Sequence, residues 1–273
     1  MATIALLISY NGAPFHGFAR QEGDLLTVQG SLEAALSLLY RREVETVCAG
    51  RTDTGVHARG QVVTFELTPK ELASRTPHSL MRSLNALTHD AIGIRQLRRA
   101  PDGFSARFDA KSRHYRYFIS DGPVSPLVMC DFCWQVCGGV SLDVNAMTAA
   151  AAYLVGEHDF KSFCLAVSAA GKPTRREVLS LTVERIEVLG DEVVCIDIVG
   201  SSFLHSMVRT IAGTLVAVGR GLRPPSWMAE VLAACDRTAA GEKAPAAGLV
   251  FWDVDYGNAL PSSDFWGKGS STW

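Results

Sequence analysis

The residues best suited to chemistry lie in a short polar loop, GRTDTGVHARG at residues 50–60. Its single carboxylate, Asp53, stands between Arg51 and His57, and glycines on both sides of it allow backbone angles that a side chain would forbid. Such a loop can turn sharply and bring a ligand close to its main chain. An ordinary turn, in which Asp53 bonds its own backbone, would have the same composition. The loop is nevertheless our candidate chemical centre, because it fixes one carboxylate between potential cations.

A second segment, from Arg95 to Arg116, mixes cations with aromatic rings. The cations are Arg95, Arg98, Arg99, Arg107, Lys111, Arg113 and Arg116, the only acids are Asp102 and Asp109, and the aromatic residues are Phe104, Phe108, Tyr115 and Tyr117. On charge alone this is a solvated strand face, but cations interleaved with aromatic rings also suit phosphates and stacked bases. The overall net charge of −2 argues against a protein that coats nucleic acid indiscriminately.

The loop and most of the rest of the chain resemble one protein family. GRTDTGVHARGQV is similar, almost letter for letter, to the signature of the TruA family of pseudouridine synthases, which modify the tRNA anticodon arm. Family-like segments follow in family order: YNGAPFHGF at 10–18, TVQGSLEAAL at 27–36, FSARFDAKSRHYRYFI at 104–119, GEHDFKSF at 156–163, FLHSMVRTIAGTLVAVG at 203–219 and GLVFWDVDY at 248–256. The resemblance therefore covers nearly the whole chain.

The resemblance implies the isomerisation of a uridine within RNA. The bond from N1 to C1′ breaks, the base rotates, and C5 bonds to C1′, so neither a redox cofactor nor a nucleotide is needed. By resemblance Asp53 is the nucleophile, which attacks either C1′ of the ribose or C6 of the base. The implied partner is tRNA, modified at positions 38, 39 and 40, and the implied assembly is a homodimer.

The resemblance also assigns four residues that bind the substrate. Arg209 corresponds to the arginine that pairs with the catalytic aspartate, and a cation there would keep the carboxylate ionised where burial alone would raise its pKa. Arg51 corresponds to an arginine that contacts RNA and helps to displace the base. Tyr115 corresponds to the tyrosine that stacks on the target base and has been proposed to remove the C5 proton. Leu249 corresponds to the apolar residue at the floor of the uracil pocket.

Two other functions fit parts of the pattern. A noncatalytic tRNA-binding or chaperone protein of the same fold would keep Asp53, Arg209 and Tyr115 without using them. An aspartyl-phosphate phosphotransferase would need acidic metal ligands near Asp53, whereas the neighbours are Arg51 and His57. The isomerase is the hypothesis that uses all of these residues.

Composition narrows the class of protein further. With 48% hydrophobic residues among 273, the chain can bury a core without disulfides or a structural metal. Neither a membrane-spanning run nor a targeting leader is recognisable, so we expect a cytoplasmic protein. The seven cysteines fit buried reduced thiols better than disulfides. Cys130, Cys133 and Cys137 have no second pair at zinc spacing, so we expect no metal.

The elements that must position these residues follow from periodicity. We predict strands at Thr3 to Tyr10, Glu43 to Cys48, Gln61 to Leu67, Ile92 to Arg99, Lys111 to Ile119, Glu177 to Val188, Glu192 to Val199 and Leu249 to Tyr256. We predict helices from Val28 to near Arg41, and over His78 to Leu87, Val144 to Val155, Phe203 to Val218 and Trp227 to Ala234.

The order of these elements predicts an α+β protein. Each half has the order β-α-β-β-α-β of a ferredoxin-like unit, and the shorter helix over Trp227 to Ala234 is an addition. Two such halves would form a broad, mainly antiparallel central sheet with helices on one face, and the family resemblance implies a catalytic cleft between the halves. We predict domains at 1–102 and 103–257, divided at a Pro-Asp-Gly cluster, and a flexible tail at 258–273.

Overall fold

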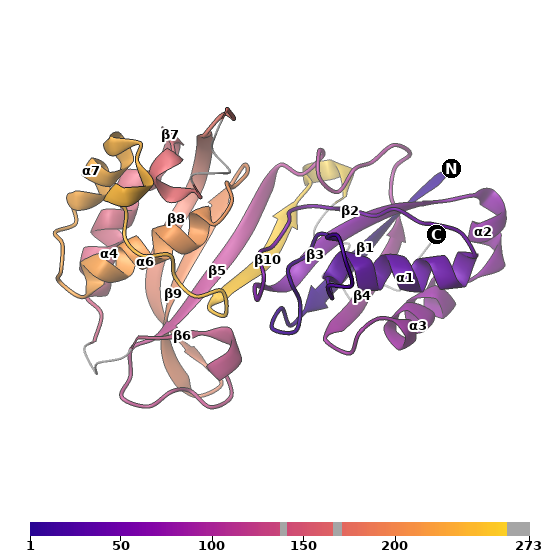
Figure 1. The fold of residues 1–273 in the computed structure, drawn as a ribbon, viewed down its shortest axis with the longest axis horizontal. Coiled ribbons are helices and arrows are strands. Elements are labelled where there is room, and N and C mark those ends of the chain that lie inside the picture. Colours follow the sequence, from indigo (N-terminus) through magenta and orange to yellow (C-terminus); the bar gives the residue numbers. More distant parts are fainter. Residues whose placement is uncertain (137–140, 166–170, 261–273) are drawn as a thin grey trace. The chain divides into compact units, whose positions relative to one another are not determined.

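The computed structural model describes residues 1–136, 141–165 and 171–260 (Figure 1). The chain forms two compact units. The first comprises Met1–Arg113 and the chain from Phe251 onward, and the second comprises His114–Val250. The division into domains at residues 102 and 103 stays a prediction, because compactness does not establish which parts fold alone.

The first unit contains a small antiparallel sheet and its helices. In chain order these are β1 (Ala2–Tyr10), α1 (Val28–Tyr40), β2 (Val47–Cys48), β3 (His57–Leu67), α2 (Pro69–Ser74), α3 (Pro77–Leu87) and β4 (Ile92–Arg99). Strand β1 lies between β4 and β3 and pairs antiparallel with both, with Ile4 opposite Phe65 and Leu6 opposite Leu97. Nearly all side chains of β1 are buried, so β1 contributes to the core on both faces of the sheet. Helix α3 contacts both α1 and β4, as Figure 1 shows.

In its described residues, the second unit contains the other strands and further helices. It holds most of β5 (Ser112–Ser120), then β6 (Trp134–Gln135), α4 (Val144–Ala151), β7 (Gly156–Asp159), β8 (Arg175–Val188), β9 (Asp191–Gly200), α6 (Met207–Gly219), α7 (Trp227–Ala234) and the start of β10 (Leu249–Asp255). The strand order is β5-β9-β8-β7, and β6 pairs parallel with β5. Helix α4 contacts α6, α7 and β8 (Figure 1).

The predicted α+β class with a large, mainly antiparallel central sheet is confirmed. Both β-α-β-β-α-β orders are present, the first with α2 added and the second with β6, β7 and α7 added. The hairpin of β8 and β9 turns through Leu189 and Gly190, whose φ angles of 54° and 89° suit the tight turn between twisted strands. The catalytic cleft between the halves stays a prediction.

Four predicted elements are wrong in extent. The strand predicted from Gln61 is β3, which begins earlier, at His57. The strand predicted from Glu43 is only β2, because Thr46 donates its backbone N–H to Glu33 Oε1 (2.9 Å) rather than to a strand. The helix predicted from Phe203 begins at Met207, since Ser206 is left-handed with a φ of 61°. The helix predicted to reach Val155 ends at Ala151 and continues as one short 3-10 turn.

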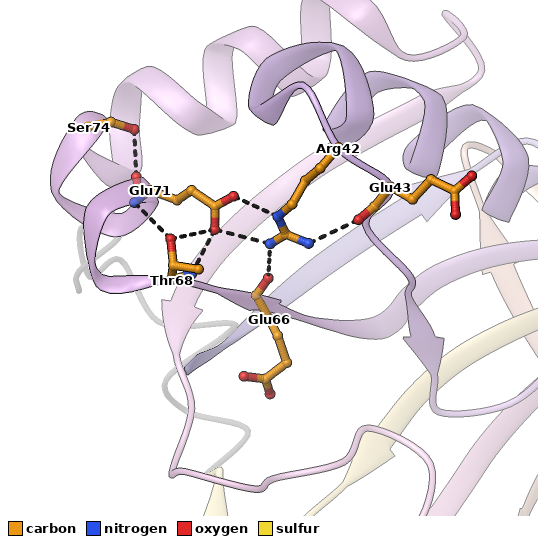
Figure 2. Close-up of polar contacts among 6 residues, drawn as sticks. All are labelled: Arg42, Glu43, Glu66, Thr68, Glu71 and Ser74. Carbon is orange, nitrogen blue, oxygen red and sulfur yellow. Dashed lines mark hydrogen bonds and ion pairs between the residues drawn. The ribbon is translucent and has the colours of Figure 1, made fainter.

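A cluster of polar contacts connects Arg42, just after the end of α1, to Glu71 of α2 (Figure 2). Arg42 Nε donates to Glu71 Oε1 (2.6 Å), and the other guanidinium nitrogens donate to the backbone oxygens of Glu43 and Glu66 (each 2.9 Å). Thr68 and Glu71 cap the start of α2 reciprocally. The hydrogen bond from Arg42 is the main reason that the pKa of Glu71 falls from 4.5 to about 2.

Candidate active site

Asp53 lies in a tight turn between β2 and β3. Its backbone oxygen accepts a hydrogen bond from Val56 N (3.1 Å), and Gly55, the third residue of the turn, has a φ of 78°. This positive φ suits the third position of a type II turn, where a side chain would be strained. Asp53 is partly buried and Arg51, two residues earlier, is exposed. The two predicted residues are therefore held on one short turn.

The segment after β1 packs closely against one side of this turn. Gly12 donates its N–H to His57 Nδ1 (3.0 Å), and a Cβ on Gly12 would lie only 2.1 Å from the backbone oxygen of Val56. Only glycine fits there. Because His57 Nδ1 accepts, a neutral His57 carries its proton on Nε2. His57 therefore helps to order the loop by accepting this hydrogen bond.

The same segment also holds the residue just before Asp53. Phe18 N donates to the backbone oxygen of Thr52 (3.0 Å), and the buried hydroxyl of Tyr10 lies 2.8 Å from Thr52 Oγ1. Burial raises the pKa of Tyr10 well above its ordinary value, so this hydroxyl stays protonated and acts as a structural group. The turn is thus anchored at Thr52 and His57, the two residues that bracket its tip.

A third anchor lies on the approach to the turn. Arg113 donates from Nε and Nη2 to the backbone oxygen of Ala49 (3.2 and 3.1 Å), and Gln61 Nε2 donates to that of Gly50 (2.7 Å). Carbonyl groups that would otherwise be solvated are therefore satisfied by fixed side chains. The backbone leading to Arg51 is held from both sides.

In the second unit, Arg209 lies on α6 beside the segment that leads into β10. Arg209 Nε donates to the backbone oxygen of Ala244 (2.8 Å), and Ala244 N donates back to the backbone oxygen of Arg209 (3.1 Å). One turn further along α6, a Cβ on Gly213 would lie 1.9 Å from the backbone oxygen of Glu242. The helix and the segment can approach this closely only because residue 213 has no side chain.

Two tyrosines of β5 occupy different positions in this unit. Tyr115 is 8% exposed and packs edge-on against Phe203, with ring centroids 5.2 Å apart. Tyr117 is fully buried, and its hydroxyl donates to the backbone oxygen of Pro245 (2.8 Å). Burial raises the pKa of Tyr117 well above its ordinary value. Leu249, 6% exposed, begins β10 and lies four residues after Pro245.

The residues 244–249 therefore link three features of the second unit. Arg209 holds the segment at Ala244, Tyr117 holds it at Pro245, and Leu249 follows at the start of β10. The structure thus groups Arg209 and Leu249 through one segment, and Asp53 and Arg51 on one turn. Contact of Asp53 with Arg209 or Tyr115 stays a prediction.

Several supporting residues lie in the family-like segments, but the sequence assigned them no role. They are Tyr10, Gly12, Phe18, Thr52, Arg113 and Gly213. The available signal was a glycine or a polar side chain inside an otherwise apolar run, which indicates a close approach or a buried hydrogen bond. The sequence does not reveal the partner, because each contact joins segments distant in the chain.

The cysteines agree with the prediction only in part. Cys133 is buried, and burial raises the pKa of its thiol to about 11, but Cys130 is exposed, so the prediction of a buried thiol is wrong there. Cys137 lies outside the described residues. Within 1–136, 141–165 and 171–260, no three His, Cys, Asp or Glu side chains gather as metal ligands. No helix in those ranges has the length and apolar character to cross a membrane.

Comparisons with known proteins agree on one family. A family model described as tRNA pseudouridine synthase matches residues 150–257. A tRNA pseudouridine synthase A of Brevibacillus brevis is 44% identical over 257 residues, which cover 94% of this chain and 100% of that protein. The protein of the same name in Ralstonia nicotianae is 45% identical, covering 96% and 94%, and that of Pseudoalteromonas atlantica is 41% identical, covering 93% and 92%.

Proposed function

Since this chain belongs to the tRNA pseudouridine synthase family, we propose that it isomerises uridine to pseudouridine in the anticodon arm of tRNA, at positions 38, 39 and 40. The structural feature that best supports this proposal is the turn that contains Asp53. It presents one carboxylate next to an exposed arginine, on a backbone anchored at Ala49, Thr52 and His57. Preorganisation of this kind places a nucleophile without a conformational cost at the moment of reaction.

In the proposed reaction, Asp53 supplies the electron pair that forms the first covalent bond. The carboxylate attacks either C1′ of the ribose, releasing uracil at N1, or C6 of the base. On the C6 route the bond from N1 to C1′ breaks after the carboxylate has added. The base then turns and C5 bonds to C1′, the bond to Asp53 breaks and returns the free carboxylate, C5 loses its hydrogen as a proton, and N1 gains a proton. No atom is imported and no electron is transferred to a cofactor.

The other predicted residues bind and position the uridine. Arg209 pairs with Asp53 and keeps it ionised, and Arg51 contacts the RNA and helps to displace the base. Tyr115 stacks on the uracil, and Leu249 forms the apolar floor of its pocket. The hydrogen bonds between Arg209 and Ala244 support this arrangement, because they hold the arginine and the approach to Leu249 together.

The protein is further proposed to act as a cytoplasmic homodimer. A tRNA is much larger than one chain, so a second copy would support the part of the RNA that lies away from the reacting uridine. Analytical ultracentrifugation of the purified protein tests this directly. A monomer at the concentration used for turnover would contradict the dimer while leaving the reaction untouched.

The decisive experiment is Asp53→Asn. The amide keeps the size of the side chain but removes its negative charge, so we expect no detectable tritium release from tRNA transcribed with [5-³H]uridine. Asp102→Asn is the matched control, since the Asp102 side chain is 75% exposed and forms its ion pair with the nearby Arg99. Normal turnover by Asp53→Asn would refute the assignment. A wild-type protein that binds tRNA without releasing tritium would support the noncatalytic alternative.

A further inference from the structure

One aromatic residue of the cation-rich segment differs sharply from the others. Phe108 is 79% exposed, whereas Phe104, Tyr115 and Tyr117 are 7%, 8% and 0% exposed. A phenylalanine this exposed forgoes the free energy that burial of its ring would provide. Of the four rings that the sequence offered for stacked bases, Phe108 alone presents an open surface.

The turn that carries Phe108 is held firmly. Ser105 N donates to Asp109 Oδ2 (2.7 Å), and Asp109 N donates back to the Ser105 backbone oxygen (3.1 Å). Ala106 lies between Ser105 and Asp109 in the chain. Its backbone N–H donates to Thr64 Oγ1 (3.3 Å), and its backbone oxygen accepts a hydrogen bond from the Tyr256 hydroxyl (2.7 Å). The ring is therefore exposed on an ordered turn, so little conformational entropy would be lost when a ligand binds it.

A cation lies against the same ring. The guanidinium of Arg107 is 5.3 Å from the centroid of the Phe108 ring, and Arg107 is itself exposed. An arginine stacked on an aromatic ring forms a combined surface that suits a nucleobase and its phosphate. An acidic protein partner would pair with the Arg107 guanidinium but would not require an exposed aromatic ring beside it.

This pair also lies next to the Asp53 turn. Arg113 Nη2 donates both to the Arg107 backbone oxygen (2.5 Å) and to the Ala49 backbone oxygen (3.1 Å), which brings these two backbones together. Ala49 is two residues before Arg51, the exposed cation of the turn. Arg113 thus connects the backbones that carry two exposed cations, Arg107 and Arg51, and exposed cations of this kind attract the phosphates of an RNA.

We propose that Phe108 and Arg107 form a stacking platform for the substrate RNA. The Phe108 ring stacks on a nucleobase adjacent to the reacting uridine, and Arg107 contacts the neighbouring phosphate. The platform takes no part in bond making and contributes equally to binding of the RNA before and during the reaction. This inference rests on the proposed function and adds a binding element outside the residues assigned to it.

The test measures kcat and KM for tRNA with Phe108→Ala, Phe108→Trp and Arg107→Ala. Loss of one stacked base predicts a KM about tenfold higher for Phe108→Ala with kcat unchanged, and near-normal KM for Phe108→Trp. Arg107→Ala should reduce the slope of log affinity against log salt by about 1, whereas Phe108→Ala should leave it unchanged. Leu222→Ala is the control, because Leu222 is 67% exposed and lies in the second unit.

The outcomes separate this inference from the proposed function. No tritium release by the wild-type protein refutes the proposed function itself. Normal wild-type turnover with an unchanged KM for Phe108→Ala refutes the platform alone. A change in sedimentation of Phe108→Ala with unaltered RNA binding would assign the ring to a protein contact and also overturn the platform.

Discussion

Gly213→Ala tests whether the close packing of α6 positions Arg209. The added Cβ would lie 1.9 Å from the Glu242 backbone oxygen and 3.4 Å from Ala244 N. Neither atom belongs to a flexible side chain, so the backbone at 242–244 must move by roughly 1 Å or more. Such a shift would stretch both hydrogen bonds between Arg209 and Ala244, now 2.8 and 3.1 Å.

Two opposing terms set the loss of stability for Gly213→Ala. Overpacking costs about 1 to 3 kcal/mol, and alanine in a helix interior recovers up to about 1 kcal/mol relative to glycine. We therefore expect a net loss of about 1 to 2 kcal/mol and a melting temperature lower by roughly 2 to 8 °C. A 1 Å displacement of a positioning group can reduce turnover about 100-fold, which is the effect expected on kcat.

The assay pairs thermal unfolding with tritium release, and Gly219→Ala provides the matched control. Gly219 ends the same helix, but its added Cβ would meet the Met147 side chain, with the nearest atom at 2.6 Å. That flexible side chain can move away, so Gly219→Ala should lose some stability and keep its kcat. The reasoning is refuted if Gly213→Ala turns over normally, or if both variants lose activity in proportion to stability.

Two further predictions concern Glu71 and Tyr115. The pKa of Glu71 is lowered to about 2, chiefly by Arg42, so its ionised form stabilises the fold above pH 4.5, and this contribution disappears as the pH falls from 4.5 through about 2. Glu71→Gln should cost about 1 to 2 kcal/mol at pH 7, allowing for solvent screening of partly exposed Arg42, and the deficit should vanish near pH 2 in urea titrations. Glu43→Gln is the control, because Arg42 contacts only the backbone oxygen of Glu43 (Figure 2); an equal loss in both variants would contradict the assignment. Tyr115→Phe should retain tRNA affinity and lower the rate of tritium release by about 100-fold or more if the hydroxyl moves the C5 proton. An unchanged rate would leave Tyr115 with stacking alone.

Much of the local structure follows from periodicity and turn chemistry. Strand β4 and helix α7 were predicted with their observed bounds, and strands were correctly predicted at β8 and β9, with ends within two residues of those observed. These elements depend on neighbours in the chain, which the sequence contains directly. One error arose where a group elsewhere in the chain intervened, because the buried Glu33 accepts the N–H of Thr46.

The sequence by itself determined the family, the α+β class and the carboxylate at Asp53, because each is encoded in a contiguous motif or in the order of elements. Only the tertiary structure decided that Phe108 is exposed while Tyr117 is buried, and that Gly12 and Gly213 are closely packed. Those properties depend on what lies opposite each residue. Folding brings together backbone segments that lie tens of residues apart in the chain. Only then is it decided whether a glycine is needed for close packing and whether an aromatic ring stays exposed.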